Sequence, residues 1–365
     1  TTYAKVALKA ILPAILYFTG IFMAVHLEAR RLNLKGISRD QLPKFGILIR
    51  SIYLLLPLVI LVWMVSTGIR TLQYSASIAI VLAILVSLPH IFAESRAQHN
   101  EGIPVRFAKD TADMIVNALE AGGRSCITVA VACSMAGIVA GWITVTGLAS
   151  KLINGVINVS NMIPYPPISM FIALFLTMLC CIVLGMGVPT TANYCIMAAT
   201  CAPILMSDQI GIKMICAHFF VFYFGIVADI TPPVALAAYA GSAIAKSPPM
   251  KTAFNATKLA IAAFVVPYIF ALNPAMLFQF DAGTSTASMV FQAVMIVITS
   301  LAGLFGVAAA LNGHLYRPMN PLFRLLIAAG GLCMMIPGNL TDVVGLVVVG
   351  GIMVYQRMAA KGRAA

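Results

Sequence analysis

Charged residues are scarce in this chain: Asp, Glu, Lys and Arg make up 9% of its 365 residues, whereas 61% are hydrophobic. A soluble domain carries about 25% charged residues. A soluble globule of this length could not enclose so much apolar surface, because the buried fraction of a chain rises only slowly with its size. Lipid is therefore the expected solvent, and long apolar runs predict an all-α polytopic membrane protein.

Acidic residues are scarcer still, 11 against 23 basic ones, and the net charge is +12. The basic residues lie in short connections between apolar runs and form no clustered basic face with aromatic residues between them. This distribution argues against a nucleic-acid partner. It is typical of the cytoplasmic loops of membrane proteins.

Patterns for metal binding and catalysis are also missing. None of the eight cysteines forms a CxxC pair near a histidine cluster, so we interpret the cysteines as small apolar packing residues. The sequence contains no recognisable nucleophile–base pair either. We therefore expect that the protein is not an enzyme.

Several apolar segments approach or exceed the roughly 20 residues that a spanning helix needs. The candidates are 6–25, 49–66, 76–92, 125–147, 212–245, 256–272, 287–311, 321–337 and 340–356. Two charged, amphipathic connections, 26–47 and 93–124, are too polar to cross a bilayer. The apolar segment 168–206 is interrupted by a glycine- and proline-containing sequence at 185–191, which favours a re-entrant hairpin over one continuous helix.

Orientation follows from the basic residues in the connections. If 168–206 is a hairpin that enters and leaves on one side, 18 of the 23 Lys and Arg residues fall on the opposite side. The positive-inside rule makes that side cytoplasmic and places the C-terminus inside. The basic residues gather on one side of the membrane only if 168–206 is a hairpin and not a single crossing. The distribution of charge therefore supports the hairpin independently.

A second interruption lies within the apolar segment 212–245. Pro232 and Pro233 remove two backbone donors and disfavour helix before them, so we expect two half-helices joined by an extended stretch. Asp229, beside these prolines, is the only acidic residue deep in an apolar stretch. A carboxylate inside a membrane is costly and marks a candidate functional site, although Asp229 could also simply cap the second half-helix.

The two interruptions offer groups for two kinds of ligand. Carbonyl oxygens freed near Gly185 and Gly187 suit Na⁺, and the amides of the helix that starts after Pro189 present a positive dipole end to an anion. In the simpler interpretation the glycines only permit a tight turn and the proline only begins a helix. A hairpin followed by a broken helix is typical of secondary transporters with a site near the membrane midplane.

Two motifs, GMGVPTTANY at 185–194 and FGIVADITPPVALAAY at 224–239, resemble the large membrane subunit of the TRAP (tripartite ATP-independent periplasmic) transporters. The PPMK turn at 248–251 and the HLEARRL run at 26–32 fit the same family. Asp229 and three further helices after residue 286 resemble its fused-permease branch, often paired with TAXI-type binding proteins. The chain then looks like the C-terminal half of such a permease.

The resemblance implies secondary active uptake of a small organic acid, a carboxylate, across the cytoplasmic (inner) membrane of a bacterium or archaeon. A periplasmic solute-binding protein would deliver the solute, and an elevator-type domain would carry it past a scaffold. The coupling ion would be Na⁺, which we favour, or H⁺. The ion-binding residues implied by the resemblance are Gly185, Gly187, Pro189, Thr190, Gly225, Asp229, Ile230 and Thr231. Thr191 and Asn193 are the expected substrate-binding residues.

This sequence departs from the family in one respect. The family has two inverted repeats, whereas only one hairpin with one broken helix is visible here. The chain also begins with Thr1 rather than Met. We therefore expect the first repeat and the small-subunit helices to precede Thr1 or to form a separate chain. That portion, the binding protein and membrane lipid are the expected partners.

The expected organisation comprises scaffold and arm helices, a transport half-domain, a further arm helix and a C-terminal three-helix extension peripheral to the ion chemistry. These occupy residues 1–124, 125–245, 246–275 and 287–356. One alternative is an elevator-type carboxylate carrier that needs no binding protein. An ion channel is another, because channels also use broken helices and carbonyl-lined loops.

Overall fold

A computed structural model describes residues 2–34, 36, 42, 45–68, 70–98, 103–233, 235–280 and 283–361. Val234 of the second motif lies outside these residues. Within the described part, secondary structure is helical apart from one isolated bridge between His314 and Pro318. The fold class is all-α, as the composition predicted.

Two compact units divide the chain, and unit 1 holds residues 1–8 and 35–130. Its helices are α2 (Phe45–Arg50), the 3-10 helix η2 (Ile52–Leu55), α3 (Leu56–Thr67), α4 (Leu72–Gln98) and the first part of α5 (Ile103–Val145). Within the unit α3 packs against α4, and the rings of Phe92 on α4 and Phe107 on α5 lie 5.5 Å apart. Unit 1 is thus a set of long antiparallel helices.

Unit 2 holds residues 9–34 and 131–365 and contains both interruptions. Its first helices are α6 (Leu148–Asn161), α7 (Pro166–Gly185), α8 (Thr190–Thr200), α9 (Ala202–Met206), α10 (Met214–Val227), η3 (Ala228–Ile230) and α11 (Leu236–Ala245). Then follow α12 (Pro249–Leu259), α13 (Ile261–Leu272), η4 (Pro274–Leu277), α14 (Thr286–Asn312), α15 (Pro321–Cys333) and α16 (Asn339–Lys361). Helix α1 (Tyr3–Arg31) begins in unit 1 and continues into unit 2.

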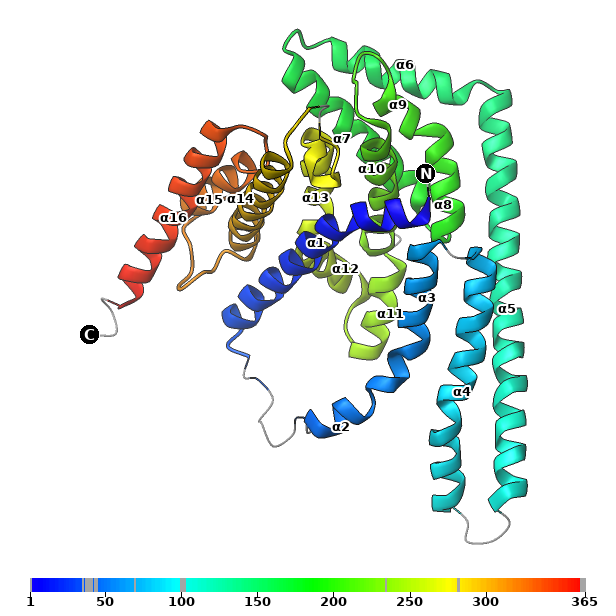
Figure 1. Cartoon of the computed structure of the whole chain (residues 1–365). Coiled ribbons are helices and arrows are strands. Elements are labelled where there is room, and N and C mark those ends of the chain that lie inside the picture. Colours follow the sequence, from blue (N-terminus) through cyan, green and yellow to red (C-terminus); the bar gives the residue numbers. More distant parts are fainter. Residues whose placement is uncertain are drawn as a thin grey trace. The chain divides into compact units, whose positions relative to one another are not determined.

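Helix α10 lies inside the core of unit 2, packed against α7, α8, α9 and α13 (Figure 1). Phe220 and Phe224 on α10 are fully buried. The ring of Tyr268 on α13 lies 5.5 Å from the ring of Phe220 and 5.8 Å from that of Phe224, both edge to face. Such aromatic pairs contribute about 0.5–1.5 kcal/mol each beyond their buried area. Large aromatic side chains therefore hold α10 in place.

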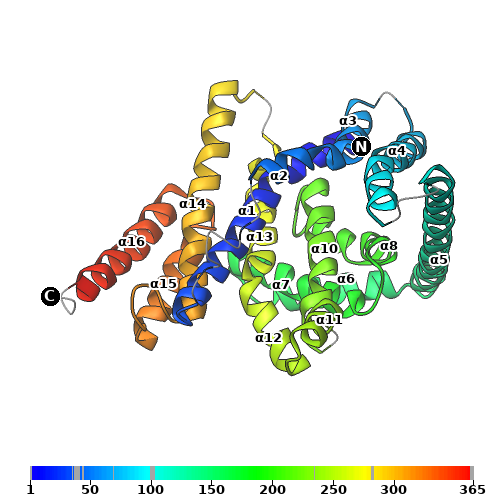
Figure 2. The same cartoon turned by 90° about the horizontal axis from the view of Figure 1, so that it is seen from below.

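Helices α14, α15 and α16 pack together as the C-terminal bundle, gold to red in Figure 2. Glycines bring α14 and α15 into backbone contact: a Cβ on Gly331 would lie 2.7 Å from the Gly303 oxygen, and one on Gly303 would lie 2.6 Å from the Gly331 oxygen. Small residues let membrane helices approach this closely. Backbone proximity, rather than large side chains, therefore sets this interface.

Helix α1 is fastened to two other parts of unit 2. The Asn312 amide at the end of α14 donates to the Ala24 carbonyl at 3.2 Å, and the Lys258 ammonium on α12 lies 3.4 Å from the Glu28 carboxylate. These contacts join residues more than 200 positions apart in the sequence. Helix α1 therefore packs as an integral part of unit 2.

Six helical segments among the described residues are long and apolar enough to cross a membrane. They are Tyr3–Arg31, Leu72–Ala93, Pro166–Gly185, Pro249–Leu272, Thr286–Asn312 and Asn339–Ala359. None of the apolar window of Leu72–Ala93 is buried within the protein. Water would not tolerate so long an apolar helix without buried residues, whereas lipid would solvate it, since its backbone groups are paired internally. The protein is an all-α polytopic membrane protein.

Helix boundaries differ from the sequence expectation in three places. Helix α5 is continuous over 43 residues, so most of the predicted connection 93–124 is helical; its charges lie at helical spacing and need no break. The stretch that we expected as one arm helix, 246–275, is two helices that meet at Ala260. The returning arm of 168–206 divides at Cys201, where Pro203 lies in the first turn of α9.

Candidate functional site

The tip of the hairpin is the four-residue connection between α7 and α8. Helix α7 ends at Gly185, Met186 is extended, and Gly187 has a φ of 74°, a left-handed conformation that glycine adopts without strain. Pro189 is the N-cap of α8, so its fixed φ leads directly into the helix. The sequence therefore interrupts the helix where its glycines and proline lie.

A buried asparagine joins the tip to the broken helix. The Asn193 amide on α8 donates to the Gly225 carbonyl on α10 at 2.9 Å, and Asn193 is 3% exposed. A Cβ on Gly185 would lie 2.9 Å from the Asn193 amide nitrogen, 3.0 Å from the Gly225 oxygen and 3.1 Å from the Ala228 Cβ. Gly185, Asn193, Gly225 and Ala228 thus meet at one point.

The Asn193 contact leaves one atom free. Because the Gly225 oxygen accepts, the NH₂ group of Asn193 must face it, and the other amide atom is the acceptor Oδ1. This Oδ1 atom is buried and has no hydrogen-bond partner among the described residues. A buried unpartnered oxygen can ligate a cation but cannot donate to a carboxylate. Its chemistry therefore suits an ion better than the acidic substrate expected from the sequence.

The break itself is held by three hydroxyl or backbone donors. The Thr231 hydroxyl donates to the Val227 carbonyl at 2.7 Å, and the Thr257 hydroxyl on α12 donates to the Ile230 carbonyl at 2.9 Å. The Thr231 amide donates to the Ala228 carbonyl at 3.2 Å. These donors satisfy much of the freed backbone, so Thr231 supports the break and Ile230 contributes its carbonyl mainly to Thr257.

Asp229 lies in the 3-10 turn η3 and is half-buried. Helix α11 has Ala235 as its N-cap, with no side-chain capping bond, so Asp229 does not cap the second half-helix. Among the residues that the structure describes, the Asp229 carboxylate has neither an ion pair nor a hydrogen-bond partner. A carboxylate in this state, one residue after Ala228 at the junction, is available to a cation.

Thr190 and Thr191 occupy the first two positions of α8 and are exposed. Helix N-termini present unpaired amides and a positive dipole end, which favour an anion. The exposed end of α8 and the buried Asn193 lie within one turn of each other. The two faces of α8 are therefore chemically different: one is exposed, and the other is buried against the broken helix.

Sequence reasoning missed two contacts that position this site. The Tyr194 hydroxyl lies 3.0 Å from the His218 Nδ1, which links α8 to α10 a second time. Thr257 reaches the break from α12, 27 residues away in the chain. Periodicity offered no signal for Thr257. Tyr194 was visible as part of the tip motif and His218 as a packing or lining residue, but nothing indicated that the two would meet.

The site contains oxygen ligands rather than the ligands of a transition metal. Within the described ranges, no group of three or more His, Cys, Asp or Glu side chains could hold a metal ion. Carbonyl, amide and carboxylate oxygens near Asn193 and Asp229 suit a hard cation. A hairpin tip packed on a broken helix, within apolar helices of spanning length, is the architecture of a secondary transporter.

The family model for the DctM component of the tripartite ATP-independent periplasmic transporters matches residues 1–281. The chain belongs to this family. It is a membrane component of a TRAP-type secondary transporter, a class that operates with a periplasmic binding protein and a small membrane subunit. No curated protein and no solved structure matches the chain.

Proposed function

We propose that this protein takes up a small organic acid across the cytoplasmic membrane, driven by an inward ion gradient and supplied by a periplasmic binding protein. The chain would act as the C-terminal half of a fused permease with a cytoplasmic C-terminus. Its hairpin and broken helix would move together as an elevator-type transport domain. The distribution of basic residues and the two motifs support these finer assignments.

The observation that carries the proposal is the contact of Asn193 with Gly225 beside the turn that holds Asp229. Among the described residues, the Asn193 oxygen is buried without a donor and the Asp229 carboxylate has no partner. A cation would compensate the buried Asn193 oxygen, which costs about 1–3 kcal/mol when it has no partner, and it would also neutralise the half-buried Asp229 carboxylate. The exposed amides of Thr190 and Thr191 would then receive the carboxylate of the solute.

We favour Na⁺ over H⁺ as the coupling ion. A proton would neutralise Asp229 alone, whereas Na⁺ would also use the Asn193 oxygen and nearby carbonyls. Gly185, Gly187, Pro189, Gly225, Ile230 and Thr231 shape this junction in the proposal, and Asn193 becomes an ion ligand rather than a substrate ligand. The contacts of Thr231 and Thr257 to the break carbonyls keep those oxygens fixed while the ion binds.

Uptake into proteoliposomes tests the coupling ion. The complete permease, with its small subunit and binding protein, is given a Na⁺ gradient alone or a pH gradient alone. Native protein should respond to Na⁺, and Asp229→Asn should lose most of that response. Asp208→Asn, in the connection before α10, is the matched control and should behave like native protein. Native uptake that persists without Na⁺ and follows the pH gradient would establish proton coupling instead.

Omission of the binding protein tests the partner. We expect uptake to fall to background, because the family delivers solute through that protein. Full uptake in its absence would make the protein a carboxylate carrier that acts alone. Flux that rises linearly with solute and never saturates would instead indicate a channel.

A further inference from the structure

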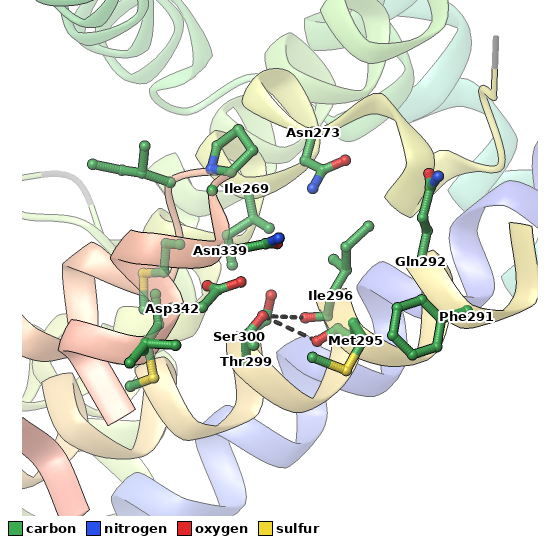
Figure 3. Close-up of a pocket in the computed structure, with 16 residues that line it drawn as sticks. Ile269, Asn273, Phe291, Gln292, Met295, Ile296, Thr299, Ser300, Asn339 and Asp342 are labelled. Atoms are coloured by element: carbon green, nitrogen blue, oxygen red, sulfur yellow. Dashed lines mark hydrogen bonds between the residues drawn. The ribbon is translucent and has the colours of Figure 1, made fainter. Parts of the chain in front are cut away.

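A cavity of about 500 Å³ lies in the C-terminal part of unit 2, apart from the hairpin and the break. It is lined by the end of α13, the first half of α14, the connection between α15 and α16, and the start of α16 (Figure 3). None of the residues proposed above for ion or solute binding lines it. The cavity is therefore a separate candidate site.

One side of the cavity is apolar. Phe291 and Met295, one turn apart on α14, line it together with Ile269 of α13 and Ile336 of the α15–α16 connection. Phe291 is 65% exposed, so its ring is not committed to the core. An aromatic face and a thioether are surfaces on which a flexible apolar chain or a cation packs well.

Among the described residues, the opposite side carries a single charge. Asp342 and Asn339, in the first turn of α16, point toward the face of α14 that bears Ser300 (Figure 3). None of the described residues that line the cavity is Lys or Arg. The Asp342 carboxylate has no ion pair or hydrogen-bond partner among the residues that the structure describes. Thr299, beside Ser300, donates its hydroxyl to the Met295 and Ile296 carbonyls of its own helix.

A simpler role for Asp342 is to complement the dipole at the start of α16. Asp342 is the fourth residue of α16 and lies past the N-cap, the position whose side chain usually accepts from the free amides of the first turn. No such bond is made by Asp342, and its carboxylate points into the cavity instead (Figure 3). The Thr341 hydroxyl donates to the Gly338 carbonyl at 2.6 Å, so it does not accept from the amides of this turn either. Asp342 is thus left for a ligand.

Size and charge select the ligand. About 500 Å³ is far more than one ion or one water molecule needs, at roughly 30 Å³ per water, and falls within the range of small-molecule sites. An anion would face an uncompensated carboxylate, and a neutral apolar molecule would leave that carboxylate unpaired. An organic cation would pair its charge with the Asp342 carboxylate and pack its apolar part against the apolar side of the cavity.

We propose that this cavity binds an organic amine, with its ammonium group on Asp342 and its apolar body against Phe291 and Met295. The ammonium can come from a free amine in solution or from the headgroup of an aminophospholipid. In either case Asn339 and Ser300 flank the ammonium, and the ligand bridges α14 and α16. This site could not be predicted from the sequence, because Asp342 lies at the end of an apolar segment and looks interfacial.

Binding of hexylammonium to the full chain in nanodiscs tests the proposal, with empty nanodiscs subtracted for partition into lipid. Isothermal titration calorimetry at pH 7.5 compares hexylammonium with hexanol and hexanoate, which share its apolar chain. We expect hexylammonium to bind at least about tenfold more tightly than either, equivalent to about 1.4 kcal/mol. Equal binding of the three compounds would overturn the proposal.

Variants locate the binding. Asp342→Asn should lower hexylammonium affinity at least about tenfold, since it removes the charge and keeps the shape, whereas Asp342→Glu should retain most of it. Asp208→Asn, remote from the cavity, should leave affinity unchanged. If Asp342→Asn does not fold, Ser300→Leu, which fills the cavity without touching the charge, should abolish binding. Undiminished binding in the folded Asp342→Asn or Ser300→Leu variant refutes the proposal.

Lipid composition separates the two sources of the ammonium. Discs of phosphatidylglycerol contain no lipid ammonium, whereas discs with phosphatidylethanolamine do. A lipid ligand would compete, so hexylammonium affinity should fall in phosphatidylethanolamine discs for native protein but not for Asp342→Asn. Equal native affinity in both discs would identify the free amine as the ligand.

Discussion

Two buried asparagines make the same contact in two regions of unit 2. Asn193 on α8 donates to the Gly225 carbonyl at 2.9 Å, and Asn312 at the end of α14 donates to the Ala24 carbonyl at 3.2 Å. Their exposed fractions are 3% and 4%, and in both the Oδ1 atom is buried and has no partner in the part of the chain that the structure describes. The two side chains would be indistinguishable from burial and bonding alone.

The carbonyls that they meet are different. Gly225 lies in the last turn of α10, where helix carbonyls lose their regular partners, so Asn193 satisfies a group that the break has released. Ala24 lies inside α1, where the helix itself supplies a donor. Asn193 also lies next to the turn that holds Asp229, whereas Asn312 lies beside carbonyls that Arg324 already covers. The contribution of a buried side-chain amide thus depends on whether the backbone carbonyl that accepts its hydrogen bond already has a donor within its own helix.

The largest expected effect follows from Asn193→Leu. This change leaves the Gly225 carbonyl without its donor, at a cost of about 1–3 kcal/mol, and removes the candidate ion ligand Oδ1. We expect the apparent affinity for the coupling ion to fall about tenfold for each 1.4 kcal/mol lost. The measurement is the Na⁺ concentration that half-saturates uptake in proteoliposomes.

The control for Asn193→Leu is a check that the variant folds. Its helical content and its elution volume in detergent should match those of native protein. A folded Asn193→Leu protein with native Na⁺ dependence would show that Asn193 only packs the tip against α10. The comparison of the two asparagines would then lose its functional meaning.

Much of the fold could be predicted from the sequence. The glycines and proline at 185–191 and the proline pair at 232–233 predicted where helices would stop, because these residues lack either a side chain or a backbone donor. Composition predicted an all-α membrane protein, and two motifs indicated the TRAP family, which the family comparison confirms. Local chemistry at the two interruptions was sufficient for these conclusions.

The rest depended on contacts between distant residues. Nothing near Asn193 indicated that its amide would meet Gly225, 32 residues away, or that Asp229 would leave the cap of α11 unused. The cavity at Asp342 needs α13, α14 and α16 together, and no single segment carries its pattern. The residue assignments at the ion and solute site stay predictions that the uptake experiments test.

The next largest effect concerns the glycine contact of the C-terminal bundle. In Gly331→Ala the new Cβ would lie 2.7 Å from the Gly303 oxygen, so α14 and α15 must move apart. Overpacking of this kind costs about 1–3 kcal/mol. Thermal unfolding in detergent should show a lower midpoint for Gly331→Ala, while the Na⁺ dependence of uptake stays native.

The control for this change is Gly350→Ala on α16, where a Cβ would meet nothing within 4 Å. A helix gains up to about 1 kcal/mol from this replacement, so its unfolding midpoint should stay or rise. A changed ion requirement in Gly331→Ala would mean that the bundle takes part in coupling, against the view that it is peripheral.

A smaller effect is expected for Asn312→Leu, the counterpart of Asn193→Leu. The Ala24 carbonyl keeps its helix donor, so only the net value of one hydrogen bond, about 0.5–1.5 kcal/mol, is lost. Removal of the unpartnered Oδ1 offsets part of this loss. The unfolding midpoint should fall slightly and Na⁺ dependence should be native. A loss of uptake as large as that of Asn193→Leu would break the comparison.

The smallest expected effect is a pH dependence at the same end of the C-terminal bundle, in His314, two residues after Asn312. Burial, with Arg30 and Arg31 nearby, lowers the pKa of His314, and its Nδ1 is buried without a partner among the described residues. Below the ordinary histidine value of about 6.5 the unfolded chain binds a proton that the native protein resists. The stabilising contribution of neutral His314 is therefore complete above pH 6.5 and is lost as the pH falls through the native pKa.

The measurement is the midpoint of thermal unfolding at pH 7.5 and at pH 5.5. The midpoint of native protein should be lower at pH 5.5, and this decrease should be smaller in His314→Gln. His26→Gln is the control and should show the same decrease as native protein. An equal fall in all three proteins would show that a charge on His314 is solvated at this end of the bundle.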